Sequence, residues 1–427
     1  MHCEVFFETA TSRLASQMGI PQLTHPSNCL SALIAPEQEA RFFDQYLGND
    51  FLAIRGHREK FREILSWRAL NGILSYQAVA PQLRMSKEGT QLPLASFLTT
   101  RYTVSGSSTQ SPNAPAIIAH LRDGASLILN EIDRLHPPIR SVAEGLEVAT
   151  RSVVQVNLYA SWRSSPGFDL HYDAHDVFIL QIEGPKHWKV FRPTERYPIS
   201  YKTQQKPDVL SLEPVFDDVL TPGDLLYIPR GWWHVVTPLD EPTMHLTAGL
   251  HPPTGIKLVE WAMRDLAASE LLRMDLPRFG DRENQRKYLA AVRENVANML
   301  RDEDLIEKFL DHVEATSDRR PRFSLPASAT PKILPDSADA IITLGSPSGF
   351  RPKPDAEPGD IKIAFAGKEL TFSDATVPLL DYLSHSAPLS VAEFCRRFED
   401  QFPVNDLKEF LAELACHGAI LVSEPEI

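Results

Sequence analysis

The sequence has few cysteines, fewer basic than acidic residues, and no long apolar run. The four cysteines, Cys3, Cys29, Cys395 and Cys416, form no Cys-x-x-Cys pair, which argues against a thiol-ligated zinc site and favours a reducing compartment. Lys and Arg number 43 against 56 Asp and Glu, so a broad grip on a phosphate backbone is not expected. No stretch approaches the ~20 apolar residues of a membrane-spanning helix. The N-terminus carries acids where a secretory signal carries bases. We therefore expect a cytoplasmic protein without membrane contact.

The 427 residues are enough for two or three domains at about 150 residues each. From Val153 to about residue 250, short runs rich in Val, Ile, Leu, Phe and Tyr alternate with Pro, Gly and Asp clusters. This pattern predicts an antiparallel barrel or sandwich. Upstream of it helical and irregular signals mix, and the polar run 105–115 is expected to be a surface loop. We predict a first domain over residues 1–252.

The signal changes to helical periodicity after the strands. Leu258, Ala262 and Leu266 recur at four-residue steps, and similar spacing continues to about residue 313, which predicts a helical segment over 253–317. Its apolar faces are too large for so small a segment to bury alone, so we expect it to form a homodimer. Residues 318–332 mix proline with small and charged residues and are expected to be a linker.

The pattern of residues 333–427 predicts a small winged-helix-like domain: a hairpin, three helices and a final strand, with Ser390 as the N-cap of the second helix. Residues 360–427 contain five basic and twelve acidic residues, a net charge of −7. A domain that binds duplex DNA through phosphates is basic, so we expect no direct duplex DNA binding here.

Two motifs in the strand-rich region carry metal-binding residue types. Residues i and i+2 of a strand point to the same face, so His171 and Asp173 are expected to reach one metal ion together. About sixty residues later, a Pro-Gly-Asp turn and an apolar strand lead to Gly-Trp-Trp-His, which ends at His234. Two imidazoles and one carboxylate on one face of an octahedral ion leave three positions open, as in non-haem Fe(II) oxygenases. We predict His171, Asp173 and His234 as the metal ligands of a catalytic centre.

With these motifs the sequence resembles the JmjC branch of the cupin superfamily, and within it the ribosomal oxygenases. The resemblance implies an α+β fold: a double-stranded β-helix (jelly-roll) barrel with flanking helices, followed by a helical dimerisation segment and a winged helix. It also implies Fe(II), the cosubstrate 2-oxoglutarate and O₂, and hydroxylation of a protein or peptide side chain. Ribosomal proteins are the leading substrate class, and arginine or histidine the leading residue types.

The resemblance further implies four residues that bind 2-oxoglutarate. Lys186 in Gly184-Pro-Lys186 matches the cation that binds the distal carboxylate, Asn157 and Tyr159 match an Asn-x-Tyr strand, and Thr247 matches a Ser or Thr near the cosubstrate. A buried carboxylate needs a paired cation, and hydroxyl groups add donors.

Several alternatives stay open at this point. His175 shares the alternation of His171 and Asp173, so a site made of these three residues is conceivable; we rank it below the set with His234. Lys186 also fits a solvated hairpin tip, and His187 and His245 fit structural positions. For the whole chain, the alternatives are a cupin metalloenzyme acting on a peptide natural product, RNA or small molecule, and a non-catalytic dimeric scaffold.

Overall fold

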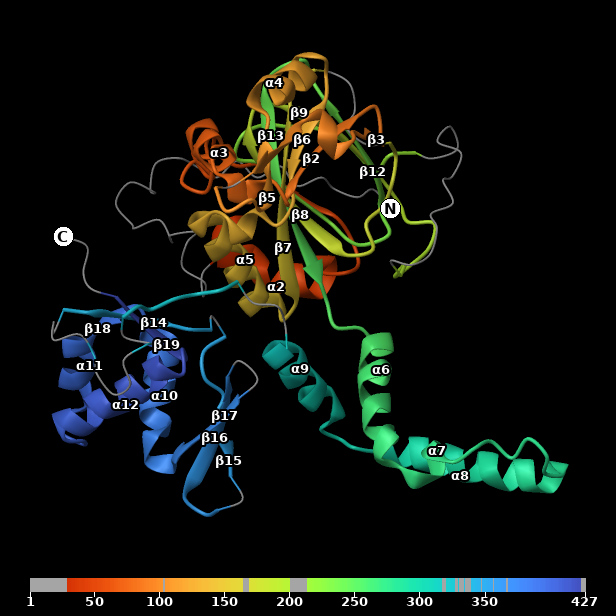
Figure 1. The fold of residues 1–427 in the computed structure, drawn as a ribbon, viewed down its shortest axis with the longest axis vertical. Helices are drawn as coiled ribbons and strands as arrows, with labels where there is room; N and C mark the ends of the chain where they lie inside the picture. The colour runs from red at the N-terminus through yellow and green to blue at the C-terminus, as the bar shows by residue number, and fades with distance from the viewer. Residues whose placement is uncertain are drawn as a thin grey trace. The chain divides into compact units, whose positions relative to one another are not determined.

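The computed structural model describes residues 29–423 except 103, 164–168, 200–212, 317–319, 327–328, 330–333, 335–338, 347, 356 and 366–367. The chain divides into two compact units, Met1–Pro252 and Pro253–Ile427, drawn as ribbons in Figure 1. Seven of the fifteen residues of the linker expected over 318–332 lie outside the described residues. In the described part of the chain, no helix combines the length and apolar character needed to cross a bilayer.

The first unit is built around an eight-stranded sheet. Its strand order is β1-β11-β8-β13-β7-β6-β2-β3, and every neighbouring pair is antiparallel. The antiparallel strands expected from residue 153 onward are confirmed. The bounds are β1 Leu52–Ile54, β2 Leu83–Lys87, β3 Thr90–Gln91, β6 Ser126–Leu129, β7 Val153–Ser161, β8 Asp176–Glu183, β11 Leu225–Ile228 and β13 Thr243–His251.

A second, three-stranded sheet has the order β10-β9-β12, with β9 Lys186–Phe191 paired to β10 Phe216–Leu220 and β12 Trp233–Pro238. Side chains from the two sheets pack into one apolar cluster, with Val177 and Ile179 from β8 against Trp188 and Val190 from β9. Because successive side chains of a strand point to opposite faces, these residues face the interior between the sheets. The two sheets therefore enclose a common interior.

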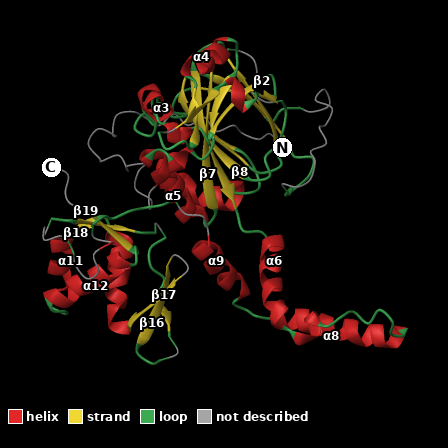
Figure 2. Ribbon diagram, in the orientation of Figure 1, coloured by secondary structure: helices red, strands yellow, loops and turns green. Residues whose placement is uncertain are grey.

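The other face of the large sheet is covered by helices, as Figure 2 shows for α5. Phe178 and Leu180, which alternate with Val177 and Ile179, belong to a second cluster that includes Ile139 and Leu146 of α5. Strand β8 is thus buried on both faces, which explains its nearly continuous apolar sequence. The helices of this unit are α1 Cys29–Ile34, α2 Glu39–Arg41, α3 Trp67–Leu74, α4 Ala114–Arg122 and α5 Pro137–Thr150.

One expectation for this unit is wrong in part. The polar run 105–115 is not simply a loop, because Ser108–Pro112 forms β5, which pairs with β4 Leu98–Tyr102, and α4 begins at Ala114. Most residues of this hairpin are exposed. A strand that buries neither face lacks the alternation of apolar residues that identifies strands from sequence.

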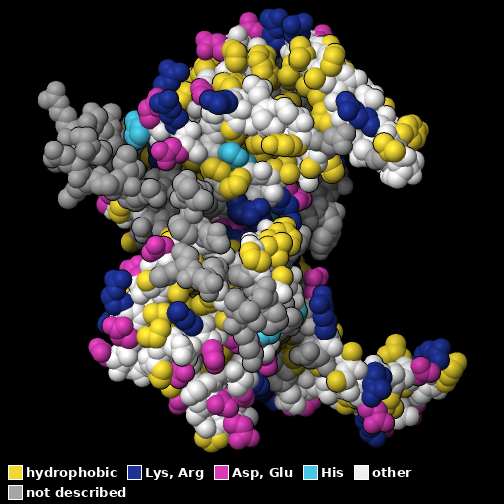
Figure 3. All heavy atoms as spheres, turned by 60° about the vertical axis from the view of Figure 1, so that its left-hand side comes forward, with side chains coloured by type: hydrophobic (Ala, Val, Ile, Leu, Met, Phe, Trp, Pro, Cys, Tyr) yellow, Lys and Arg dark blue, Asp and Glu magenta, His cyan; other side chains and the backbone are white. Residues whose placement is uncertain are grey.

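The second unit begins with the expected helices: α6 Gly255–Asp265, α7 Glu270–Arg273, α8 Arg282–Leu300 and α9 Leu305–Thr316. Helix α8 has 19 residues and none of them is buried. Apolar side chains along these helices are accessible to solvent, as the yellow side chains of the arm at the lower right of Figure 3 illustrate. The exposed ones include Met263, Met274, Leu276, Phe279, Leu289 and Leu300.

The rest of this unit has its own apolar core, formed by α10 Val377–Ser386, α11 Val391–Phe398 and α12 Val404–Cys416. The N-cap expected at Ser390 is confirmed, because its hydroxyl accepts a hydrogen bond from the Glu393 backbone N–H at 3.1 Å. The strands are β14 Ile341–Leu344, β15 Lys353–Pro354, β16 Asp360–Phe365, β17 Lys368–Ser373, β18 Leu389–Ser390 and β19 Ile420–Ser423, in two three-stranded sheets.

Candidate active site

His171 and His234 are paired directly through their backbones. The His171 N–H donates to the His234 carbonyl at 3.2 Å, and the His234 N–H donates to the His171 carbonyl at 2.8 Å. Two residues that exchange both hydrogen bonds carry their side chains on the same face of the pair. The imidazole rings are accordingly neighbours, with centroids 4.4 Å apart.

Backbone carbonyls fix which nitrogen of each imidazole carries the hydrogen. Nδ1 of His171 lies 2.7 Å from the Asp169 carbonyl oxygen, and Nδ1 of His234 lies 3.1 Å from that of Trp232. A carbonyl oxygen only accepts, so each Nδ1 carries the hydrogen and each Nε2 keeps its lone pair. Burial, and then the neighbouring His171, lower the pKa of His234 to about 4, so its ring is neutral near pH 7. Both rings are therefore prepared to bind a metal through Nε2.

Asp173 supplies the third group. One ligand atom each from His171, Asp173 and His234 lie within 4.8 Å of one another, and the Asp173 Oδ2 to His234 Nε2 distance is 3.7 Å. The Asp173 carbonyl accepts a hydrogen bond from the Gly231 N–H at 2.9 Å, which ties it to the turn before β12. Gly231 has φ +84°, a conformation that favours glycine in this turn.

The structure corrects the expected secondary structure around these ligands. His171 and Asp173 are not in a regular strand, since β8 begins only at Asp176 and His171 forms an isolated bridge. Pairing to His234 and Gly231, rather than a strand of a sheet, holds them.

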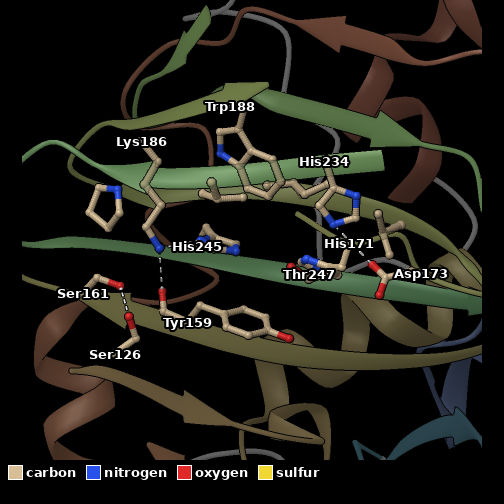
Figure 4. Close-up of a pocket in the computed structure, with 14 residues that line it drawn as sticks. Ser126, Tyr159, Ser161, His171, Asp173, Lys186, Trp188, His234, His245 and Thr247 are labelled. Atoms are coloured by element: carbon tan, nitrogen blue, oxygen red, sulfur yellow. Dashed lines mark hydrogen bonds and ion pairs between the residues drawn. The ribbon is translucent and has the colours of Figure 1, made fainter. Parts of the chain in front are cut away.

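These three residues line one end of a cavity of about 260 Å³ between the two sheets, shown in Figure 4. Each strand contributes alternate residues, as a strand does when one face borders a cavity. The lining residues are Ser126 from β6, Tyr159 and Ser161 from β7, Val177 and Ile179 from β8, Lys186 and Trp188 from β9, His234, Val236 and Pro238 from β12, and His245 and Thr247 from β13, with His171 and Asp173.

Lys186 lies at the other end of the cavity (Figure 4) and is only 2 % exposed, which excludes a solvated hairpin tip. It follows the Gly184-Pro185 turn; a Cβ on Gly184 would lie 2.1 Å from the Pro242 carbonyl oxygen, so the turn requires glycine. Its Nζ donates to the Tyr159 carbonyl at 3.3 Å and to His245 Nδ1 at 2.7 Å. Burial lowers the pKa of Lys186 to about 7.

Three of the four residues expected at the cosubstrate line this cavity, and one does not. Tyr159 and Thr247 border it together with Lys186. Asn157 is not among the lining residues; its side-chain oxygen accepts hydrogen bonds from the Glu131 N–H at 3.0 Å and from Gln155 Nε2 at 3.3 Å. Burial raises the pKa of the Tyr159 phenol, which is therefore protonated and able to donate a hydrogen bond.

Sequence reasoning missed Ser126, Ser161 and the position of His245 in the lining of the cavity. The two serine hydroxyls lie 2.8 Å apart and are 3 % and 4 % exposed. Ser161 stands two residues after Tyr159, so strand alternation was a signal for it. Nothing in the sequence connects Ser126, on β6, with this site.

Other polar residues near the motifs have structural partners. The His175 ring stacks on His251 at 4.4 Å, and His187 pairs with Asp217 at 2.5 Å on a partly exposed face. Asp176 accepts hydrogen bonds from the Tyr227 hydroxyl and the Arg230 N–H. None of these is in the group of three metal-ligating side chains found among the described residues.

The donor set fits the groups that the motifs imply. Two imidazoles and a carboxylate suit a divalent transition metal. At the far end, no carboxylate of the described residues pairs with the buried Lys186 ammonium. A buried cation without a counterion is costly, so this end fits the carboxylate of a ligand.

Comparison with known proteins finds similar sequences for this region. Residues 134–258 match the JmjC domain. The bifunctional lysine-specific demethylase and histidyl-hydroxylase NO66 of Drosophila pseudoobscura pseudoobscura is 31% identical over 222 residues, which is 51% of this chain and 22% of that protein. Ribosomal oxygenase 2 of Mus musculus is 36% identical over 110 residues, 26% of this chain and 23% of that protein. The chain thus spans less than a quarter of the length of these relatives in the matched regions.

A solved structure matches over almost the whole chain. The crystal structure of the Escherichia coli ribosomal oxygenase YcfD has a TM-score of 0.59 and 19% sequence identity, and the match covers 90% of this chain and 98% of that one. At this identity the likeness shows a shared fold. Residues 134–258 therefore resemble the JmjC domain, in a chain that is similar in part to the NO66 and ribosomal oxygenase proteins and shares the fold of YcfD.

Proposed function

We propose that this protein is an Fe(II)- and 2-oxoglutarate-dependent oxygenase that hydroxylates an amino-acid side chain of a protein. The observation that carries the proposal is the two-ended cavity, with His171, Asp173 and His234 at one end and the buried Lys186 ammonium at the other. Another structure of YcfD holds cobalt and 2-oxoglutarate, which supports the same pair of ligands here.

Bound ferrous iron and 2-oxoglutarate supply the oxidising chemistry: O₂ is consumed, 2-oxoglutarate becomes succinate and CO₂, and one oxygen atom enters a C–H bond of the substrate. The chain's own residues bind and orient. The imidazoles of His171 and His234 and the Asp173 carboxylate would hold the metal and leave further positions for ligands. Lys186 would hold the distal carboxylate, and Val177, Ile179 and Trp188 give the space between an apolar wall.

The proposed substrate is a protein side chain, with ribosomal proteins the leading class and arginine or histidine the leading residue types. The names of the relatives, a histidyl-hydroxylase and a ribosomal oxygenase, support this choice. Mass spectrometry of cellular proteins with and without the enzyme tests it. We expect a protein that gains 15.99 Da, roughly one oxygen atom, only when the enzyme is active.

Purified protein provides the matched biochemical test. Succinate formation with the identified substrate is expected to need Fe(II), 2-oxoglutarate and O₂, and to disappear in His171→Ala but not in His187→Ala, whose side chain lies outside the cavity. If an RNA or a small peptide gains the oxygen instead, the proposed substrate class, a protein, is wrong. Failure to bind 2-oxoglutarate without oxygen would favour a non-catalytic scaffold.

We also propose that the helices of residues 253–317 form a homodimer interface. The support is the exposed apolar surface of these helices, with Phe279 96 % exposed and Leu276 65 % exposed. A helix such as α8, with no buried residue, gains little stability from its own unit. Light scattering is expected to give twice the 47.9 kDa chain mass, and Phe279→Asp with Leu276→Asp to shift the protein toward a monomer.

For residues 333–427 we propose a winged-helix-like domain that does not bind duplex DNA. The order α10, β18, α11, α12, β19, with β14 between β18 and β19 in the sheet, supports the fold, and the acidic composition supports the absence of DNA binding. Fluorescence anisotropy with labelled duplex DNA is expected to show no binding at physiological salt.

A further inference from the structure

His245 occupies a central place in the cavity without belonging to the metal-ligating group. It lies on β13 two residues before Thr247, so both side chains point to the same face, and it is 5 % exposed. In Figure 4 its ring lies between Lys186 and Thr247. The Tyr159 ring stacks on it, with ring centroids 5.0 Å apart and an interplanar angle of 14°. The Trp188 ring packs on it edge-to-face, with centroids 5.4 Å apart. Packing on two sides thus fixes the orientation of the imidazole.

The hydrogen bond to Lys186 fixes where the ring carries its hydrogen. Lys186 Nζ lies 2.7 Å from His245 Nδ1. In its protonated form, which is the form that attracts a carboxylate, Lys186 has donors and no acceptor, so Nδ1 is then the acceptor and carries no hydrogen. Burial, and then the Lys186 charge, hold the pKa of His245 well below its usual range, so the ring is neutral. A neutral imidazole with a bare Nδ1 has its hydrogen on Nε2.

This Nε2–H donor has no hydrogen-bond acceptor among the side chains and backbone groups that the structure describes around it. Because His245 lines the cavity, an acceptor that binds there can take up this donor. Lys186 shows the same feature: two of its three ammonium hydrogens have the Tyr159 carbonyl and His245 as acceptors, which leaves one for a ligand. Both unused donors therefore lie at the same end of the cavity.

We propose that Lys186 and His245 bind the distal carboxylate of 2-oxoglutarate together, with Lys186 fixing His245 in the Nε2–H tautomer so that Nε2 donates to a carboxylate oxygen. This inference rests on the proposed function, because it names a further residue of the same cosubstrate site. It assigns to His245 a direct contact with the ligand, where packing alone would require only an aromatic ring of similar size.

His245→Phe separates these two roles. Phenylalanine keeps the stacking on Tyr159 and Trp188 and removes both nitrogens, whereas glutamine in His245→Gln has an oxygen that accepts from Lys186 and an amide that donates to the ligand. His187→Phe is the matched control, since His187 lies on β9 beside Lys186 but is paired with Asp217 outside the cavity. Each full-length protein is loaded with Mn(II), and the dissociation constant of 2-oxoglutarate is measured by calorimetry under nitrogen.

A hydrogen bond to a charged group is worth about 10- to 100-fold in affinity, so we expect H245F to weaken 2-oxoglutarate binding by that factor. H245Q is expected to stay within about threefold of the native protein, and H187F to bind normally. Binding of 2-oxobutyrate, which lacks the distal carboxylate, is expected to be unchanged in H245F. Mn(II) affinity is measured in every variant to show that the metal end is intact, and His245→Met replaces H245F should the latter fail to fold.

The outcomes separate this inference from the proposed function. If the native protein binds 2-oxoglutarate no more tightly than 2-oxobutyrate, the cosubstrate site itself is wrong, and the part given to His245 is wrong with it. If the native protein prefers 2-oxoglutarate but H245F binds it normally, only the inference about His245 is overturned. Equal weakening of 2-oxoglutarate and 2-oxobutyrate in H245F also overturns it, because the contact is then not with the distal carboxylate.

Discussion

The two ends of the cavity differ in charge and in exposure. At the metal end Asp173 has 30 % of its side chain exposed, and the three side chains there offer lone pairs that suit a cation. At the other end Lys186 is 2 % exposed and offers only hydrogen-bond donors to a ligand. A ligand with a chelating head and an anionic tail therefore binds in one direction only. The accessible end is also the one that a large substrate is able to reach.

Removing one metal ligand is expected to have the largest effect. Loss of a residue that only hydrogen-bonds to a metal ligand lowers metal affinity by about 10- to 100-fold. Loss of a ligand itself should cost more, so we expect Asp173→Ala to lower Mn(II) affinity by more than about 100-fold. Asp217→Ala is the matched control, because Asp217 is a carboxylate on β10 that pairs with His187 and Lys189 outside the cavity. Calorimetry under nitrogen measures both. Native metal affinity in Asp173→Ala would show that the three groups do not bind the ion.

The opposite end is tested by Lys186→Met, which keeps the length of the side chain and removes its charge. We expect 2-oxoglutarate affinity to fall about 10- to 100-fold while Mn(II) affinity stays native, because the two ends hold different ligands. Lys189→Met controls for the loss of a lysine from the same strand, since Lys189 is partly exposed and pairs with Asp217. A loss of metal binding in Lys186→Met would mean that the two ends are not independent.

The difference in charge also predicts a pH dependence. Burial lowers the pKa of Lys186 to about 7 in the free protein, and a bound carboxylate stabilises the ammonium form and raises that pKa. The ligand therefore binds the protonated lysine better, and its affinity falls as the pH rises through the pKa of the free protein. The expected loss is about tenfold between pH 6 and pH 8. Calorimetry across this range measures it, and the dependence should vanish in Lys186→Met.

The sequence predicted the metal end better than the cosubstrate end. His171, Asp173 and His234 stand in two short motifs whose residue types are unusual outside metal sites, so the pattern carried their identity. Their local structure was harder to predict from the sequence, because the bridge between His171 and His234 joins segments more than sixty residues apart. Pairing of that kind depends on how two sheets close, which no local pattern encodes.

At the cosubstrate end the sequence gives weaker signals. Ser126 lies on β6, far along the chain from Lys186, and a serine in a strand has no distinctive meaning. His245 was expected to be structural, since its hydrogen bond to Lys186 exists only once β9 and β13 face each other. Asn157, which an Asn-x-Tyr pattern predicted at the ligand, does not line the cavity itself; its side chain hydrogen-bonds to the Glu131 backbone and to Tyr159, which does line it. Alternation along a strand identifies a face but not what borders it.

His175 gives the smallest expected effect and tests the alternative ligand set. It shares the alternation of His171 and Asp173, but its ring stacks on His251 and contacts Gly249, where an added Cβ would lie 2.6 Å from the imidazole. We therefore expect His175→Ala to keep Mn(II) affinity within about threefold. Larger losses of metal affinity are typical of residues that hydrogen-bond directly to a metal ligand, and His175 instead stacks on His251. The lost packing should lower the free energy of unfolding by about 1 kcal/mol, measured by urea denaturation. If His175→Ala lost as much metal affinity as His171→Ala, the ion would be bound by His171, Asp173 and His175. The metal end of the cavity would then be formed by this local run and not by His234.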